Sequence, residues 1–139
     1  MKYAMFIGRW QPFHNGHKYI IDQALNAGKN VVVALRDTSI NDKNPYSILE
    51  RKMMIRKVYP DGDRVKIIVI PDIESVNIGR KVGYDVNRYD APENIEGISA
   101  TEIRDLMSKG NHKWKEFVPG AMHLLLKNLE DVRGNKNAI

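Results

Sequence analysis

Two histidines stand three positions apart in the segment that follows the first apolar run of the chain. The segment is GRWQPFHNGH, in which His14 and His17 flank Gly16. Two imidazoles at the start of a helix can face one anion together and donate hydrogen bonds to it, where the helix dipole also favours negative charge. Gly16 leaves room for close contact where a larger side chain would collide. This pattern indicates a phosphate-binding site.

The same ten residues are compatible with two further roles for the histidines. The imidazoles could ligate a metal ion, although no third ligand is marked nearby, or they could be solvated loop residues. Gly8, at the start of the segment, would let the backbone approach a ligand closely. The ten-residue string as a whole favours the phosphate site over both alternatives.

A second cluster lies in the segment ISATEIR. Ser99 and Thr101 stand at a predicted helix start, where backbone amides are free, and Arg104 follows about one turn later. A phosphate there could accept hydroxyl, amide and guanidinium hydrogen bonds together. Taken alone, the segment is equally typical of a capped helix with a solvated arginine.

A third cluster is NPYSILER, in which Arg51 stands on the first turns of another predicted helix. Its guanidinium could reach a phosphate at the same edge of the molecule. The alternative is an ordinary charged helix face that includes Glu50 and Arg51.

Three apolar runs and the helical patterns between them predict the element order that positions these clusters. Unbroken runs at 3–7, 31–35 and 65–70 are typical of parallel strands, and helical patterns occupy 16–28 and 47–59. The alternation implies right-handed crossovers. In such sheets, ligands bind at the carboxyl ends of the strands. We therefore expect an α/β fold: a single Rossmann-like domain with an open parallel sheet and helices on both faces.

The second half of the chain is less regular and contains more glycine and proline. We expect one nucleotide-binding-type domain over 1–129 and a frayed polar tail over 130–139. The further elements expected are a short strand within 82–89, a helix over 99–109, a helical turn at 114–118 and a last helix from Pro119 to 129.

The charge and composition of the chain limit the kinds of molecule that it could bind and the chemistry that it could carry out. The chain has 139 residues and a net charge of +5. Residues 1–70 carry 12 basic and 6 acidic side chains, whereas residues 71–139 carry 10 and 11. A basic first half attracts polyanions such as nucleotides, phosphorylated small molecules or nucleic acid. The absence of cysteine excludes disulfides, thiolate metal sites and a cysteine nucleophile. No segment reads as a signal peptide or membrane span, so we expect a cytoplasmic protein.

The motifs taken together resemble a known enzyme superfamily. GRWQPFHNGH resembles the GRFQPFHxGH signature of the HxGH nucleotidyltransferases, and ISATEIR is similar to their second signature, of the ISSTxIR type. NPYSILERKMMI and KWKEFVPGAM look most like segments of archaeal-type nicotinamide mononucleotide adenylyltransferases. The resemblance covers about residues 3–129.

The resemblance implies an adenylyltransferase that joins AMP from ATP to nicotinamide mononucleotide, with Mg²⁺ accompanying ATP. Such a reaction needs no protein nucleophile, because the acceptor phosphate attacks the α-phosphate in line. The implied catalytic residues are His14, His17 and Arg104. The implied ATP-phosphate ligands are Gly8, Arg9, Gly16, Ser99, Thr101 and Arg104, and the expected substrate-binding residues are Trp10, Gln11, Arg51, Arg80 and Tyr84.

One departure concerns the acceptor. The archaeal-type enzymes carry an additional strand–helix unit before the second signature, where this chain has only residues 71–97. Within them, Arg80 and Tyr84 could form a substituted acceptor loop or a surface turn. Phosphopantetheine-type adenylylation and CTP-dependent transfer therefore stay open as alternatives.

A different class is a non-catalytic nucleic-acid-binding module. The aromatic-interleaved basic stripe typical of single-strand binders is absent from the sequence. We therefore expect small-molecule substrates, ATP and a phosphorylated acceptor, with no nucleic acid and no membrane partner. The resemblance also implies self-association into a homo-oligomer.

Overall fold

Strands and helices alternate through the first half of the chain, and helices make up the second half. The computed structural model describes residues 1–80 and 82–137, with side chains through Val132. In chain order the elements are β1 (Tyr3–Gly8), α1 (Asn15–Asn26), β2 (Asn30–Asp37), α2 (Ile48–Val58), β3 (Val65–Pro71), α3 (Glu93–Glu96), α4 (Ala100–Ser108), the 3₁₀ turns η1 (His112–Phe117) and η2 (Gly120–Met122), and α5 (His123–Asn137).

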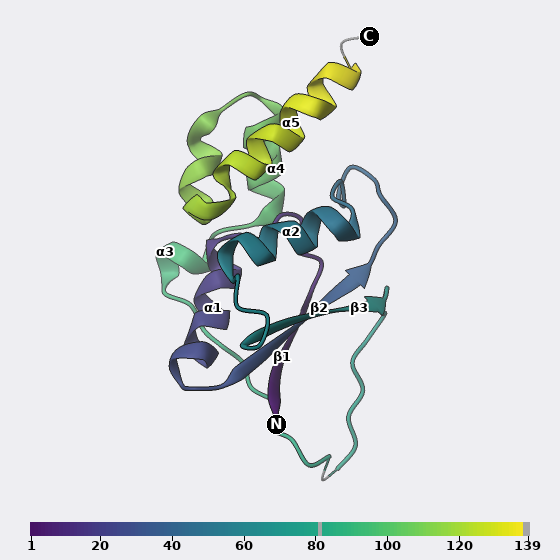
Figure 1. Ribbon diagram of the computed structural model, residues 1–139, viewed down its shortest axis with the longest axis vertical. Helices are drawn as coiled ribbons and strands as arrows, with labels where there is room; N and C mark the ends of the chain where they lie inside the picture. The colour runs from purple at the N-terminus through teal and green to yellow at the C-terminus, as the bar shows by residue number, and fades with distance from the viewer. Residues whose placement is uncertain (81, 138–139) are drawn as a thin grey trace.

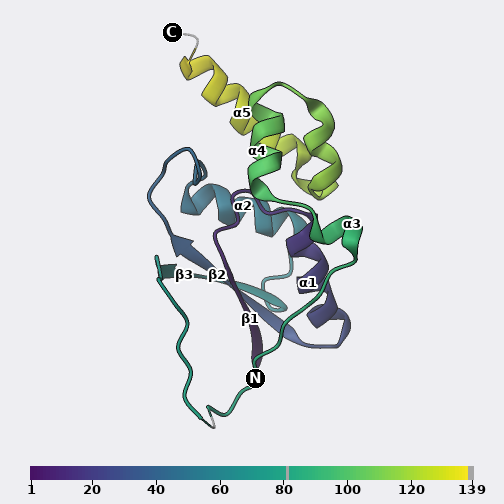
Figure 2. The same ribbon diagram turned by 180° about the vertical axis from the view of Figure 1, so that it is seen from behind.

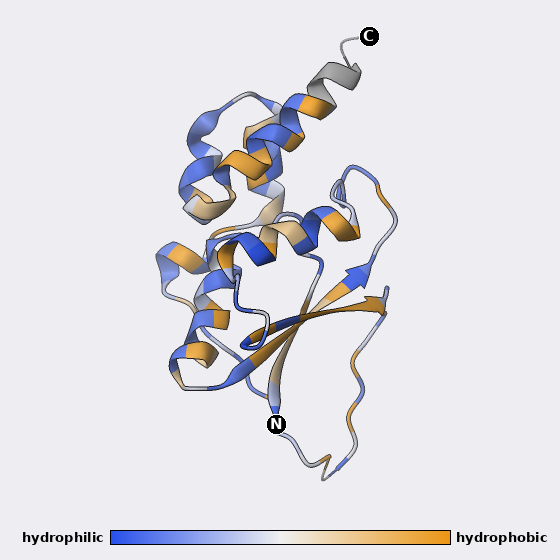
Figure 3. Cartoon of the chain, viewed as in Figure 1, coloured by the Kyte–Doolittle hydropathy of each residue, from blue (hydrophilic) through white to orange (hydrophobic). Residues whose placement is uncertain are grey.

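The three predicted strands form one parallel sheet with β2 in the centre. Val33 of β2 lies beside Phe6 of β1 on one side and Ile67 of β3 on the other. The strands are short and rich in β-branched and other apolar residues, which suit a pleated and covered surface. Figure 3 shows this hydrophobic character along β3. The expected α/β, Rossmann-like fold is confirmed.

Both crossover helices lie on the same face of the sheet. Val31 and Leu35 of β2 are buried in one cluster with Ile21 of α1 and Ile55 of α2. Right-handed crossovers that advance in one direction, from β1 to β2 to β3, place their helices on one side. The sequence predicts helices on both faces, but the opposite face leaves Met5, for example, 56% exposed.

The helices α4 and α5 and the two 3₁₀ turns pack beyond α2, in the upper part of Figure 1, whereas α3 lies beside α1. Trp114, Met122 and Leu126 bury their side chains in the same cluster as Met54 of α2. The helix α5 continues to Asn137, past the predicted end at 129 and into the predicted tail. Proline is absent from that stretch, and a lone glycine costs a helix only about 1 kcal/mol, so nothing there ends it.

The described residues between β3 and α3, 72–80 and 82–92, lie between the end of β3 and the outer edge of β1 and have no regular structure. The strand expected within 82–89 is wrong for the described residues 82–89, which have no strand pairing. Gly83 adopts a positive φ of 81°, and Val86 is 65% exposed, so these residues have neither the extended backbone nor the covered surface of a strand. Figures 1 and 2 show both described stretches of this segment extending away from α4, past the level of the N-terminus.

Candidate active site

The two histidines cap α1 together. The Nδ1 atom of His14, the residue before the helix, accepts a hydrogen bond of 3.0 Å from the Gly16 amide. The Nδ1 atom of His17 accepts one of 3.2 Å from the His14 amide. The pair forms a capping box in which imidazoles take the place of the usual hydroxyl and carboxylate. The three-residue spacing is therefore a requirement of the helix start.

This arrangement determines where the ring protons reside. A nitrogen that accepts a backbone N–H cannot carry a proton, so each neutral ring is protonated on Nε2. Burial lowers the pKa of His14 to about 4. The pKa of His17 is also lowered, by burial and then by the neighbouring His14. At neutral pH both rings are uncharged, and each presents one Nε2–H donor.

Aromatic rings hold the two imidazoles in place. The rings of His14 and His17 are stacked, with centroids 3.6 Å apart and planes inclined by 19°. Trp10 meets His17 edge-on at 4.6 Å, and Phe13 lies 5.5 Å from it. Such packing leaves His17 little freedom to rotate.

The two glycines of the segment serve internal packing. A Cβ atom on Gly8 would lie 2.9 Å from the indole of Trp10, and one on Gly16 would lie 2.9 Å from the imidazole of His14. Contacts this short do not occur, so both positions need glycine to admit a neighbouring ring. The room at Gly8 that the sequence assigns to a ligand is occupied by Trp10.

Arg104 reaches from α4 to the first segment. Its Nη1 donates to the carbonyl of Gln11 at 2.7 Å, and its Nη2 donates to the Thr101 hydroxyl at 3.5 Å. Burial lowers the pKa of Arg104, and the nearby charge of Arg9 lowers it further. An arginine keeps its charge through such a shift. The positive charge of Arg9 is therefore near enough to act on Arg104, and an anion bound near both would relieve their repulsion.

The second signature begins α4 as expected. The Ser99 hydroxyl accepts the Glu102 amide at 3.2 Å, which identifies Ser99 as the N-cap. Thr101 is exposed beside it. The structure thus brings the start of α4 next to the start of α1, although Ser99 is already engaged as a cap.

Gln11 joins two loops rather than facing solvent. Its side-chain amide donates to the Tyr46 carbonyl at 3.0 Å, and its oxygen accepts the Tyr46 amide at 2.9 Å. The side chain is 3% exposed, and the bond between Gln11 and Pro12 is cis. Both polar atoms of the Gln11 side chain therefore bond to the backbone of Tyr46. Gln11 holds the two loops together and has no polar atom left for a substrate.

Arg51 is buried completely and binds backbone carbonyls. Its Nη1 donates to the carbonyls of Arg9 and Arg36 at 2.9 and 2.8 Å, and its Nε donates to that of Ser47 at 3.2 Å. Burial lowers the pKa of Arg51, and the negative charge of Asp37 opposes that shift. The side chain joins the segment after β1, the end of β2 and the start of α2.

Three buried polar atoms in this region have no partner. They are the Thr38 hydroxyl, the Asn44 side-chain oxygen and Nη2 of Arg51. The first two belong to the loop between β2 and α2, where the Thr38 amide and Arg51 both donate to the Arg36 carbonyl. Unpartnered buried polar groups are rare and need a physical reason. Thr38 and Asn44 are not among the residues predicted from the sequence, where their only signal is their place after β2.

Arg80 and Tyr84 do not join the other candidates. Both belong to the segment 72–92, and Tyr84 is 62% exposed. The described stretches of that segment extend away from α4, past the level of the N-terminus (Figures 1 and 2). The structure therefore separates these two residues from His14 and His17.

A hollow of about 490 Å³ lies along α1, and Asn15, the residue after His14, is among the residues that line it. Asn15 and Tyr19 of α1 line it on one side, and Ile95 and Ile98 line it on the other. It is large enough for a nucleoside, and both apolar and hydrogen-bonding groups face it.

The described part of the chain contains neither a membrane-spanning helix nor a cluster of metal ligands. No helix within 1–80 and 82–137 is both long and apolar enough to cross a membrane. In the same residues, no three His, Cys, Asp or Glu side chains gather in a way that could hold a metal ion. Among the residues that the structure describes, the histidines of the first signature therefore have no set of metal ligands around them.

The comparisons with known proteins agree with this geometry. A family model described as cytidylyltransferase-like matches residues 5–89, which is more than half of the chain. The chain belongs to this family. It is a nucleotidyltransferase, as the paired signatures predict.

Among its relatives are archaeal proteins named nicotinamide-nucleotide adenylyltransferase. The one from Ignicoccus hospitalis is 31% identical over 160 residues, and the alignment includes 94% of each chain. The one from Pyrobaculum aerophilum is 29% identical over 158 residues, with 91% of this nucleotidyltransferase and 88% of the relative. Since 158 positions exceed the 139 residues present here, the relative has stretches with no counterpart.

One solved structure is similar over most of the fold. It is a bifunctional NMN adenylyltransferase/ADP ribose pyrophosphatase from Francisella tularensis, with a TM-score of 0.59 and 25% identity. The match covers 84% of the nucleotidyltransferase and 45% of that longer chain. The likeness concerns only the part of that protein that aligns.

Proposed function

We propose that this nucleotidyltransferase transfers AMP from ATP to nicotinamide mononucleotide, forming NAD and pyrophosphate. The observation that carries the proposal is the pair of neutral imidazoles at the start of α1, each with an Nε2–H donor, next to Arg9 and Arg104. Neutral donors and nearby cations suit a triphosphate whose charge shifts during the reaction. The archaeal relatives, named for the nicotinamide nucleotide, support the acceptor.

In the proposed reaction the protein forms no covalent intermediate. A phosphate oxygen of nicotinamide mononucleotide bonds to the α-phosphorus of ATP, and the bond from that phosphorus to the bridging oxygen of the β-phosphate breaks. Pyrophosphate leaves with the electron pair. His14 and His17 would donate hydrogen bonds to the α-phosphate as its charge rises, and Arg104 would balance the charge on pyrophosphate.

The adenosine and the β- and γ-phosphates of ATP would bind around the histidine pair. The adenosine of ATP would occupy the hollow beside α1, because Asn15, which follows His14, and Ile98 of the second signature both line it. Thr101 and the amides at the start of α4 would bind the β- and γ-phosphates. Ser99 would act there mainly as the cap that keeps those amides in place.

The acceptor phosphate would lie toward the loop between β2 and α2. Nη2 of Arg51 and the hydroxyl of Thr38 are buried hydrogen-bonding groups that lack a partner. Both atoms are closed to solvent in this structure and Arg51 is fully buried, so a phosphate would satisfy them only after the loop between β2 and α2 had moved aside. We therefore place the acceptor near Arg51, and Arg80 and Tyr84 outside the site.

Mg²⁺ would accompany ATP rather than occupy a protein cage. The groups around the histidines are imidazole and guanidinium donors, which do not ligate Mg²⁺, whereas phosphate oxygens do. The ion would supply charge neutralisation on the phosphates, and the histidines and Arg104 would orient them.

The deciding experiment measures pyrophosphate release from ATP and Mg²⁺ with and without nicotinamide mononucleotide, with mass analysis of the product. NAD should appear only when both substrates are present. The same assay with phosphopantetheine as acceptor, and with CTP in place of ATP, tests the alternatives. Saturable ATP binding without NAD formation would contradict the proposed acceptor and leave the nucleotidyltransferase assignment intact.

A further inference from the structure

Trp10 has an unusual backbone conformation for its residue type. Its φ is 55°, in the left-handed region that large side chains seldom adopt. Such a conformation persists only where the surroundings hold it, and it often marks a functional site. The packing around Trp10 shows what holds it.

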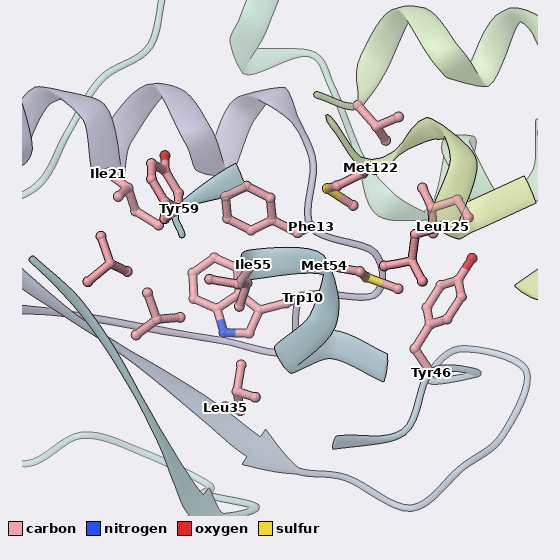
Figure 4. Packing of buried hydrophobic residues seen from close by; sticks show 14 of the residues in the cluster. Trp10, Phe13, Ile21, Leu35, Tyr46, Met54, Ile55, Tyr59, Met122 and Leu125 are labelled. Carbon is pink, nitrogen blue, oxygen red and sulfur yellow. The ribbon is translucent and has the colours of Figure 1, made fainter. Parts of the chain in front are cut away.

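The indole is anchored in the sheet side of the core. Its Nε1–H donates to the carbonyl of Ala34 in β2 at 3.1 Å, and Gly8 leaves the space that the ring fills. Figure 4 shows the ring among Phe13, Ile55 and Leu35, with its nitrogen toward the sheet. Only 3% of Trp10 is exposed, so the ring offers almost no surface to a substrate.

The anchored ring meets His17 directly. Its plane is inclined by 78° to the imidazole, with the centroids 4.6 Å apart. His14 stacks on the same imidazole at 3.6 Å. A half-turn of the His17 ring would exchange its two edges, and Nδ1 would lose the amide of His14. The indole of Trp10 packs against the His17 ring and hinders that rotation.

We infer that Trp10 is a positioning residue that holds His17 with its Nδ1 on the His14 amide and its Nε2–H toward the substrate. This inference rests on the proposed function for the role of His17 in the reaction. It replaces the expectation that Trp10 binds substrate. It also accounts for Gly8, which would be a partner of the indole rather than of a phosphate.

The test compares Trp10→Leu and Trp10→Phe with a matched control, Trp114→Phe. Trp114 is also buried, and it also meets a histidine edge-on, His123 at 5.7 Å, but it lies outside the site. The readouts are kcat and KM for ATP, and the ¹⁵N NMR signals of the His17 ring nitrogens, which report the tautomer and pKa without any turnover.

Trp10→Leu should lower kcat by about tenfold or more while KM for ATP changes by less than about threefold, because a displaced catalytic group loses orientation. Its His17 ring signals should shift toward a mixture of tautomers. Trp10→Phe should show a smaller change in the same direction, since it keeps an aromatic edge but loses the hydrogen bond to Ala34. Trp114→Phe should leave the His17 signals unchanged.

Two results would overturn the inference: unchanged His17 ring signals in both Trp10 variants, or a rise in KM with normal kcat, which would indicate substrate contact. If Trp10→Leu fails to fold, the ¹⁵N signals of the His17 ring in Trp10→Phe test the inference instead. Failure of the proposed function would look different, because NAD formation would be absent from the wild-type protein while the ring signals still reported on Trp10.

Discussion

At the scale of single residues, the histidine pair serves the fold and the site with different atoms. Nδ1 of each ring binds a backbone amide at the start of α1, and Nε2 of each ring is left to donate. The neutral state of the pair follows from burial, which lowers both pKa values. This division of the ring atoms leads to one expectation for turnover and one for stability.

Replacement of His17 by alanine should reduce kcat by at least about 100-fold, the usual cost of losing a donor to the transition state. The assay is NAD formation at saturating substrates. His112→Ala is the matched control, because His112 is exposed on η1 and should keep normal turnover. Near-normal turnover of the His17 variant would contradict its place in the site.

Acidification should destabilise the protein between about pH 6.5 and pH 4. The pKa of His14 is lowered from 6.5 to about 4 in the folded protein, so the unfolded chain binds the proton first as pH falls. The difference approaches about 3 kcal/mol for His14 once the pH is near 4. Urea unfolding at pH 7, 6 and 5 measures it.

The control for this pH dependence is His14→Asn, since asparagine can still cap a helix but does not titrate. That variant should show a weaker loss of stability between pH 7 and 5 than the parent protein. An equal loss in both proteins would mean that His14 does not cause the dependence.

At the scale of elements, buried polar side chains join the loops at the carboxyl ends of the strands. Gln11 connects the segment after β1 to the start of α2, and Arg51 connects both to the end of β2. The contacts from Gln11 to Tyr46 and from Arg51 to Arg9 span 35 and 42 positions of the chain, and the contact from Arg51 to Arg36 spans 15. They set the distance between the first signature and the loop before α2.

Arg51→Lys should lower the free energy of unfolding by about 2 kcal/mol, because an ammonium cannot reach three carbonyls in the planar geometry of a guanidinium. It should also raise the KM for the acceptor more than that for ATP. Urea denaturation and steady-state kinetics measure the two effects. Lys52→Arg, at an exposed neighbouring position, is the control. Unchanged stability would show that the carbonyl contacts contribute little.

At the scale of the whole molecule, the segment 72–92 determines which residues are kept out of the site. Its described stretches extend past the level of the N-terminus, and Tyr89 in the second of them lies 5.8 Å from Phe6 of β1. In the described residues the sheet stops at three strands, and α4, α5 and the two 3₁₀ turns pack beyond α2.

The double variant Arg80→Ala with Tyr84→Ala should therefore keep kcat/KM for the acceptor within about twofold of the parent value. Both residues are exposed and belong to the segment 72–92, whose described stretches run away from α4. Arg51→Lys provides the contrast in the same assay. A selective rise in acceptor KM in the double variant would return these two residues to the site.

The local pattern of the chain was enough for most of the fold and for the histidine pair. Continuous apolar runs predicted the three strands, and Ser47 with Glu50 predicted the capping box at the start of α2. The apolar pattern over 16–28 predicted the helix that begins at the histidine pair. These features depend on contacts within a few residues, which the sequence displays directly.

The tertiary structure decided which candidate residues are buried and which stay accessible. Whether Trp10, Gln11 and Arg51 point outward or inward depends on carbonyls of Ala34, Tyr46 and Arg36, which belong to other elements. The helix-free face of the sheet and the distant position of Arg80 follow from chain direction and a long irregular segment. Those outcomes depend on contacts between distant residues, which no local spacing encodes. The sequence by itself thus determined the fold class and the paired histidines at the start of α1, and the packed structure divided the remaining candidates into buried residues and exposed ones.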